Sequence, residues 1–250
     1  MIDLNGKIVS LPLSGGINSA AVLCWLIESG MKPKELHLYY AHFEEHSPST
    51  LAFVHRQMGE AKRYFDNVIC TITYNSVLEF FENAKMIPHP RNSPCSRLLK
   101  IEPMVTHNSI HGVQVDLIGF VRTEKRRIDA MNESRGASDM FMTKAFPIEM
   151  FDEEWCFEIV RKLIGWYPFI YDIRSIDGKR LFKHNNCLPC KNMTIEQMEA
   201  VAYWFPIYMA KAHELSIKLQ VYWGRDADAY YTTFGKPDYE SDQCEVCKFD

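Results

Sequence analysis

The sequence contains no apolar run long enough to cross a membrane, and its first residues lack the basic and apolar segments of a secretion signal. It also contains no internal repeat and no low-complexity stretch. These absences exclude membrane-spanning helices, repeat architectures and low-complexity assemblies. We therefore expect a cytoplasmic protein that does not bind membranes.

Positive charge is not in excess, because 28 Lys and Arg residues stand against 32 Asp and Glu residues, for a formal net charge of −4. This balance excludes a protein that coats nucleic acid by charge alone, while a local basic patch remains open. The 250 residues are 47% hydrophobic and 13% aromatic, which is typical of a globular enzyme. That length suffices for one large domain, alone or with a small appendage.

The eight cysteines are not expected to form disulfides in the cytoplasm. Two C-x2-C pairs lie in polar, loop-like sequence, Cys187 with Cys190 and Cys244 with Cys247. This pattern indicates four-thiolate binding of zinc or of an iron–sulfur cluster, with free thiols or a redox dithiol as alternatives. More than fifty residues separate the pairs, so the fold must bring them together. Three other cysteines lie in apolar segments and are predicted core residues: Cys24, Cys70 and Cys156.

The most informative stretch is residues 14–19, with the sequence Ser-Gly-Gly-Ile-Asn-Ser. An apolar run at residues 8–13 predicts a buried strand before it, and a mostly apolar run ending at Gly30 predicts a helix after it. First-turn N–H groups of a helix lack intrahelical partners, and the helix dipole favours negative charge at that end. The stretch therefore predicts a phosphate or pyrophosphate site. It has neither the Lys-Ser/Thr pair of a Walker loop nor the spacing of a dinucleotide fingerprint.

Strands and helices alternate through the first half, with strands predicted at residues 36–43, 68–74 and 113–120. Helices are predicted at 50–65, 76–83 and 95–108, so we expect a doubly wound α/β domain with a mostly parallel sheet over residues 1–145. Three polar segments, 14–19, 44–49 and 119–127, follow predicted strands, where such sheets bind ligands. Residues 146–250 are predicted to form a helical, cysteine-bearing extension with helices at 153–164, 195–205 and 208–220.

These segments resemble the PP-loop, or N-type, ATP pyrophosphatase superfamily, in its PAPS reductase-like and DNA phosphorothioation sulfurtransferase-like branch. Residues 14–19 are similar to the pyrophosphate loop Ser-Gly-Gly-x-Asp-Ser. Residues 94–103 look like a Cys-x3–4-Lys-x2-Pro segment, and residues 43–50 fall where the branch carries a Glu-x-Pro-x-Thr-like loop. Residues 119–127 are similar to a Gly-x-Arg-x2-Glu-Ser-x2-Arg segment.

The resemblance implies an adenine nucleotide alpha hydrolase-like fold and an enzyme that adenylates a substrate or transfers sulfur. Its implied ligands are ATP or an adenylyl-sulfate nucleotide, Mg²⁺, and a 4Fe-4S cluster rather than zinc on the paired cysteines. The sulfur acceptor, whether nucleic acid, small molecule or protein, stays open, as does the choice between a homodimer and a complex with other proteins. Implied nucleotide contacts are Ser14, Gly15, Gly16, Ile17, Asn18, Ser19, Glu45, Gly119 and Arg122, and implied catalytic residues are Asn18, Cys95, Lys100 and Glu124.

Several residues depart from the family pattern. Asn18 replaces the Asp of the loop and removes a charge that would help hold Mg²⁺, so ATP binding is expected more firmly than hydrolysis. No Glu-Cys-Gly tail is present, so PAPS reduction itself is not expected. The alternative is a nucleotide-binding, metal-stabilised module that has lost catalysis and acts in regulation or in a complex. Cys95 stays open as a further thiolate ligand, a sulfur-carrying nucleophile or a packed residue.

Overall fold

A computed structural model describes residues 2–86, 94–133 and 142–220 of the chain. Within these residues the strands form one five-stranded sheet, in which every neighbouring pair is parallel and the order is β3-β2-β1-β4-β5. The chain moves outward from β1 to β3 and then returns to the other side of β1. The predicted doubly wound α/β fold is therefore confirmed, with its switch point between β1 and β4. The strands are β1 (Ile8–Leu13), β2 (Glu35–Phe43), β3 (Val68–Asn75), β4 (Val115–Leu117) and β5 (Thr143–Ala145).

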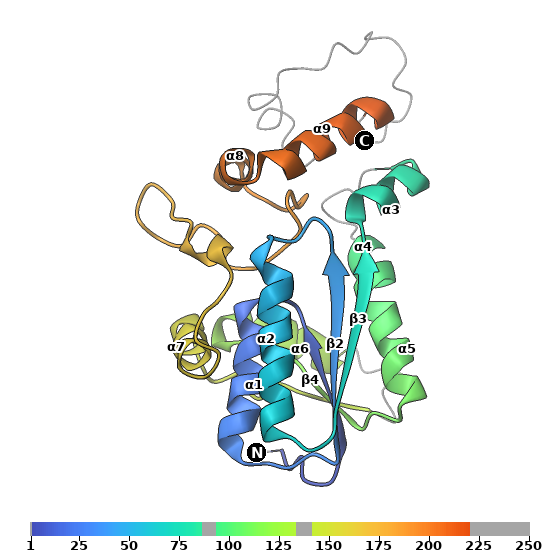
Figure 1. Cartoon of the computed structure of the whole chain (residues 1–250), viewed down its shortest axis with the longest axis vertical. Coiled ribbons are helices and arrows are strands. Elements are labelled where there is room, and N and C mark those ends of the chain that lie inside the picture. The colour runs from blue at the N-terminus through green and yellow to red at the C-terminus, as the bar shows by residue number, and fades with distance from the viewer. Residues whose placement is uncertain (1, 87–93, 134–141, 221–250) are drawn as a thin grey trace.

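Helices cover both faces of the sheet (Figure 1). On one face, α1 (Ile17–Ser29) packs against α2 (Ser49–Tyr64) and α7 (Glu153–Leu163), whereas α5 (Glu102–Ile110) lies on the other. Burial on both faces explains why β1 and β2 read as nearly continuous apolar runs. The remaining helices and turns are α3 (Val77–Ala84), α4 (Pro94–Ser96), η1 (Arg97–Ile101), η2 (Arg122–Glu124), α6 (Lys125–Glu133), η4 (Phe169–Asp172), α8 (Ile195–Trp204) and α9 (Pro206–Leu219).

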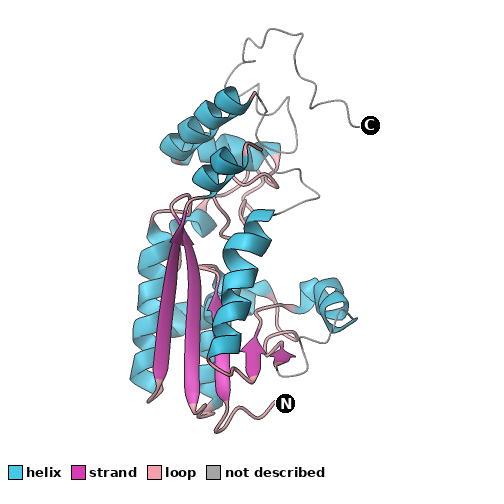
Figure 2. Cartoon of the chain, turned by 90° about the vertical axis from the view of Figure 1, so that its right-hand side faces the viewer, coloured by secondary structure: helices cyan, strands magenta, loops and turns pink. Residues whose placement is uncertain are grey.

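The carboxyl ends of the long strands point toward α8 and α9, as Figures 1 and 2 show. Thr194 caps α8 by accepting from the Gln197 N–H, and the Gln197 side chain accepts in return from the Thr194 N–H. Asp152 caps α7 by accepting from the Trp155 N–H at 3.0 Å. These two caps confirm the helix starts that the sequence predicts. In the described part of the chain, no helix is both long and apolar enough to span a membrane.

The structure corrects the sequence prediction at two strands and one helix. β4 is shorter than the predicted strand because the chain turns after it, with the Phe120 N–H donating to the Ile118 carbonyl at 3.0 Å. β5 was not predicted, since three residues carry too little periodicity to identify an edge strand. The predicted helix 95–108 is interrupted by the π-helical turn η1, where the Glu102 N–H donates to the Arg97 carbonyl.

Two of the three predicted core cysteines are fully buried. Cys24 in α1 and Cys156 in α7 have no exposed surface, and burial raises the pKa of each thiol to about 12. Cys70 is only half-buried, because it lies on the edge strand β3. The core prediction is therefore confirmed for Cys24 and Cys156 and holds in part for Cys70.

Asp116 in β4 carries a buried carboxyl, exposed by 2%, and burial raises its pKa from 3.8 to about 7. Because the folded state binds this proton more tightly, stability falls as pH rises from about 4 to about 7 and then levels off. We expect Asp116→Asn to raise the free energy of unfolding at pH 8 by up to roughly 4 kcal/mol, and to have little effect at pH 4. Urea unfolding at both pH values measures this, and an equal effect at the two would contradict it.

Candidate nucleotide site

Residues 14–19 form a tight turn between β1 and α1, closed by hydrogen bonds between its own serines. The Ser14 N–H donates to Ser19 Oγ at 3.1 Å, and the two serine hydroxyls lie 3.0 Å apart. The Gly16 N–H donates to Ser14 Oγ at 3.2 Å. Gly15 has φ +72°, a left-handed conformation that an L side chain rarely adopts, and a Cβ there would lie 2.4 Å from Thr50 Cγ2. The glycine is therefore required by both the backbone and the packing.

Two side chains from the second half of the chain hold this turn in place. The Tyr171 hydroxyl, in η4, accepts from the Ile17 N–H at 3.1 Å. The Asn185 amide donates to the Gly15 carbonyl at 2.8 Å and to Thr50 Oγ1 at 2.7 Å. All these contacts are buried, and burial also raises the pKa of Tyr171, so the phenol stays protonated. The loop is thus preorganised by residues more than 150 positions away in sequence.

A cavity of about 350 Å³ opens beside the loop, at the carboxyl ends of β1 and β4. Its position at the switch point is where doubly wound sheets bind ligands. Three cationic side chains, Lys100, Arg127 and Lys183, share the lining with the loop, so the cavity is suited to an anion. The structure brings these residues of the sequence prediction to its wall: Ser14, Gly16, Ile17, Asn18, Ser19, Lys100, Gly119 and Glu124.

Gly119 lies directly against the loop. A Cβ on Gly119 would lie 2.9 Å from both the carbonyl carbon and the carbonyl oxygen of Asn18. Backbone atoms cannot move aside as a flexible side chain can, so only glycine allows the chain after β4 to approach this closely. Packing therefore requires a glycine here, while the predicted contact of Gly119 with a nucleotide stays a prediction.

Asn18 and Glu124 meet at the cavity wall, where Asn18 Nδ2 donates to Glu124 Oε2 at 3.3 Å. The same carboxylate accepts from the Val121 N–H at 3.3 Å and pairs with Arg127. The Arg127 guanidinium also stacks over the Phe120 ring, 4.2 Å from the centroid. Glu124 is therefore held by the Asn18 amide, the Val121 N–H and the Arg127 guanidinium. Arg127 also lines the cavity.

Three predicted nucleotide contacts do not line the cavity: Gly15, which belongs to the loop itself, and Glu45 and Arg122, which lie elsewhere. Glu45 is 2% exposed and accepts from the Val77 and Leu78 N–H groups at 2.9 and 3.2 Å, so its carboxylate caps the start of α3. Arg122 is exposed and forms an ion pair with Asp152 at 3.6 Å. Neither lines the cavity beside the loop, where Arg127 supplies the guanidinium instead.

A second, smaller cavity of about 110 Å³ is lined by three thiols, those of Cys95, Cys187 and Cys190. Lys100 lines both cavities, and its ammonium lies 4.8 Å from the centroid of the Phe43 ring. Burial raises the pKa of Cys187 to about 12 and also raises that of Cys190, while the charge of Lys100 opposes both shifts. The predicted partners Cys244 and Cys247 lie outside the described residues.

No protein-family model matches this chain, and no curated protein sequence does. Solved structures do match it. PAPS reductase from Candida auris, in a phosphate complex, is 16% identical with a TM-score of 0.46, over 66% of this chain and 77% of that one. The U34-tRNA thiolase NcsA from Methanococcus maripaludis, with its [4Fe-4S] cluster, is 12% identical with a TM-score of 0.49. The match covers 98% of this chain and 81% of that one.

An NMN synthetase from Francisella tularensis matches with 12% identity and a TM-score of 0.45, over 83% of this chain and 87% of that one. All three proteins belong to the PP-loop ATP pyrophosphatase superfamily, which the sequence motifs resemble. The similarity is one of fold.

Proposed function

We propose that this chain is a PP-loop enzyme that binds ATP at residues 14–19 and catalyses adenylation or sulfur transfer. The observation that carries the proposal is the cavity at the first turn of α1, which unites a glycine-rich turn with Lys100, Arg127 and Lys183. Its volume of about 350 Å³ lies within the range of small-molecule sites. In this proposal residues 1–145 are the nucleotide-binding domain, and residues 146–250 close its loop through Tyr171 and Asn185.

In the proposed adenylation, an acceptor oxygen attacks the α-phosphorus of ATP, the bond from that phosphorus to the bridging oxygen breaks, and pyrophosphate leaves with the electron pair. The loop N–H groups and the cations Lys100 and Arg127 stabilise the charge of the leaving pyrophosphate. Glu124 is the carboxylate of the cavity that suits the Mg²⁺ carried by ATP. For sulfur transfer, a sulfur nucleophile from an external donor then displaces AMP from the adenylated acceptor.

The proposed metal centre rests on the thiol cavity. A buried thiol with a raised pKa becomes a thiolate when a metal ion binds it, so Cys187 and Cys190 suit ligation more than free reactivity. Cys95 is the third thiol of the cavity, and Cys244 and Cys247 remain candidate ligands. We favour an iron–sulfur cluster over zinc, because the resemblance to the PAPS reductase-like branch implies such a cluster. When bound, such a cluster supplies a site that holds sulfide.

A nucleotide-binding module without catalysis is the second candidate. It is favoured by Asn18, whose amide donates to Glu124 where a second carboxylate would help to bind Mg²⁺. Pyrophosphate release from Mg²⁺-ATP, with and without a sulfur donor, separates the two. Release that depends on residues 14–19 supports the enzyme, whereas tight ATP binding with no release in any condition supports the module.

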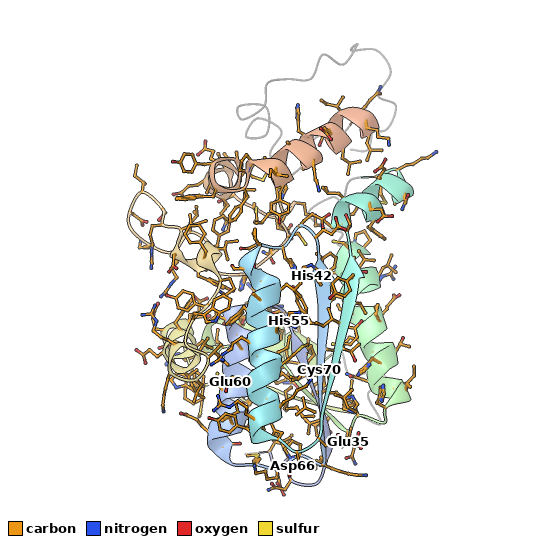
Figure 3. All side chains as sticks on the ribbon, in the orientation of Figure 1. Glu35, His42, His55, Glu60, Asp66 and Cys70 are labelled. Atoms are coloured by element: carbon orange, nitrogen blue, oxygen red, sulfur yellow. The ribbon has the colours of Figure 1, made fainter. Side chains whose placement is uncertain are left out.

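Cys187→Ser is expected to remove most of the bound metal, because the centre loses a thiolate ligand. Cys70→Ser is the matched control, since Cys70 lies on β3 (Figure 3) and does not line the thiol cavity. Anaerobic purification, elemental analysis, sulfide determination and a visible absorption spectrum measure the result. Equal metal content in the two variants would rule out this centre, while cysteine-dependent zinc without iron would identify the zinc alternative.

A further inference from the structure

A cluster of three histidines lies at the amino end of the sheet, opposite the nucleotide cavity. His37 comes from β2, whereas His107 and His111 come from the last turn and the end of α5. One ligand nitrogen from each residue lies within 4.8 Å of the other two. In residues 2–86, 94–133 and 142–220, no other three His, Cys, Asp or Glu side chains form such a group.

The distances within the cluster fit a tetrahedral metal ion. His37 Nδ1 lies 3.2 Å from His107 Nε2. Zinc–nitrogen bonds of about 2.0–2.1 Å at a tetrahedral angle place two ligand nitrogens roughly 3.3 Å apart. The spacing of these two nitrogens therefore fits an ion between them, once each ring turns so that its lone pair points at the ion instead of along the line between the nitrogens.

Glu35 orients the buried histidine of the cluster. His37 is fully buried, and its Nε2 lies 3.3 Å from Glu35 Oε2. A proton on Nε2 that bonds to this carboxylate leaves the lone pair of Nδ1 directed at His107. Metal-binding histidines are commonly fixed by a carboxylate in this way. Burial also lowers the pKa of His37 and of His107, which favours the neutral imidazole that binds metals.

The C-terminal end of α5 suits a cation. His107 and His111 are four residues apart, so they lie on the same face of the helix. His111 is the C-cap of α5, where the negative end of the helix dipole favours positive charge. His111 is exposed, so the outer side of the cluster is open to water.

We propose that His37, His107 and His111 bind one Zn²⁺ ion, with Glu35 orienting His37 and water as the fourth ligand. This site is separate from the nucleotide loop, because His37 pairs with Ser10 of β1, four residues before Ser14 and about 13 Å away along the strand. Figure 3 shows Glu35 at the lower end of the sheet, away from α8 and α9. The ion would fasten the end of α5 to β2 and stabilise that side of the sheet.

Co²⁺ titration of the chelator-treated, full-length protein tests the proposal. His111→Gln is expected to bind one equivalent fewer than the wild type, because this exposed ligand is lost without disturbing the core. The difference spectrum should contain d–d bands but no thiolate-to-cobalt charge transfer, which distinguishes this site from the cysteines. His55→Gln is the matched control, since His55 is exposed on α2, away from the cluster.

Zn²⁺ competition provides a second measurement. Glu35→Gln should keep the wild-type stoichiometry and weaken Zn²⁺ binding about 10- to 100-fold, as expected for loss of an orienting carboxylate. Zn²⁺ should raise the melting temperature of the wild type and of His55→Gln by the same amount, and that of His111→Gln by less, because the variant keeps only the cysteine ligands. Equal stoichiometry and equal Zn²⁺ stabilisation in the wild type and His111→Gln would mean that the cluster is only histidine packing.

Discussion

Gly16→Val is expected to weaken ATP binding at least tenfold, which corresponds to roughly 1.4 kcal/mol. A Cβ on Gly16 would lie 3.0 Å from the Tyr171 hydroxyl and 3.2 Å from Ser14 Oγ. Two further methyl groups must then displace the hydroxyl that accepts from the Ile17 N–H, and with it the N–H groups that are proposed to face phosphate. Calorimetric titration with ATP and with AMP measures the loss.

Gly59→Val is the matched control for that substitution. Gly59 lies within α2, and a Cβ there would meet no atom within 4 Å apart from its chain neighbours and the backbone of its own helix. The control should therefore bind ATP like the wild type, and both variants should keep their cysteine-bound metal. Unchanged ATP and AMP affinity in Gly16→Val would mean that residues 14–19 are only a turn, and the proposed function would fail with them.

Asn18→Asp is expected to raise the rate of Mg²⁺-dependent release of pyrophosphate from ATP at least tenfold. This corresponds to an activation free energy that is lower by about 1.4 kcal/mol. The amide of Asn18 lies 3.3 Å from Glu124, so the substitution places two carboxylates side by side at the cavity wall. They repel each other unless a divalent cation lies between them, and Mg²⁺ prefers carboxylate oxygen to an amide. Without Mg²⁺ the variant should be less stable than the wild type, because the Asn18–Glu124 hydrogen bond becomes a repulsion.

The double variant Asn18→Asp with Glu124→Gln tests whether the effect comes from this pair. This double variant should not show the faster Mg²⁺-dependent release of pyrophosphate expected for Asn18→Asp, since only one carboxylate remains at the cavity wall. Pyrophosphate release over a range of Mg²⁺ concentrations measures both variants. If the wild type already turns over briskly and Asn18→Asp slows it, then Asn18 is adapted to a different substrate and the argument for impaired hydrolysis is wrong.

The candidate nucleotide site could be predicted only in part. The predicted turn at residues 14–19, Gly119 and Glu124 lie together at the cavity, and strand ends, glycines and motif order are local signals that indicate them. Their contact with a nucleotide stays a prediction. Tyr171 and Asn185 are not among the predicted site residues, although both hold the loop. Glu45 was assigned to the nucleotide because its sequence position cannot show that α3 supplies N–H groups to its carboxylate.

The histidine cluster could not be predicted from the sequence either. His107 and His111 have helical spacing that a sequence reveals, but His37 joins them only because β2 packs beneath the end of α5. Cys95 likewise reaches the cavity of Cys187 and Cys190 across more than ninety residues of chain. Each grouping depends on long-range packing, on which neither spacing nor composition carries information.

The sequence by itself determined the alternating strands and helices, the two-sided burial of the sheet, the main helix caps and the place of the glycine-rich turn. These features follow from periodicity, glycine and capping residues, which act over a few neighbouring positions. Only the tertiary structure decided which side chains hold that turn, which arginine faces the cavity, and which thiols and imidazoles lie together. Those outcomes depend on how distant segments pack, because burial and contact distance are properties of the folded chain.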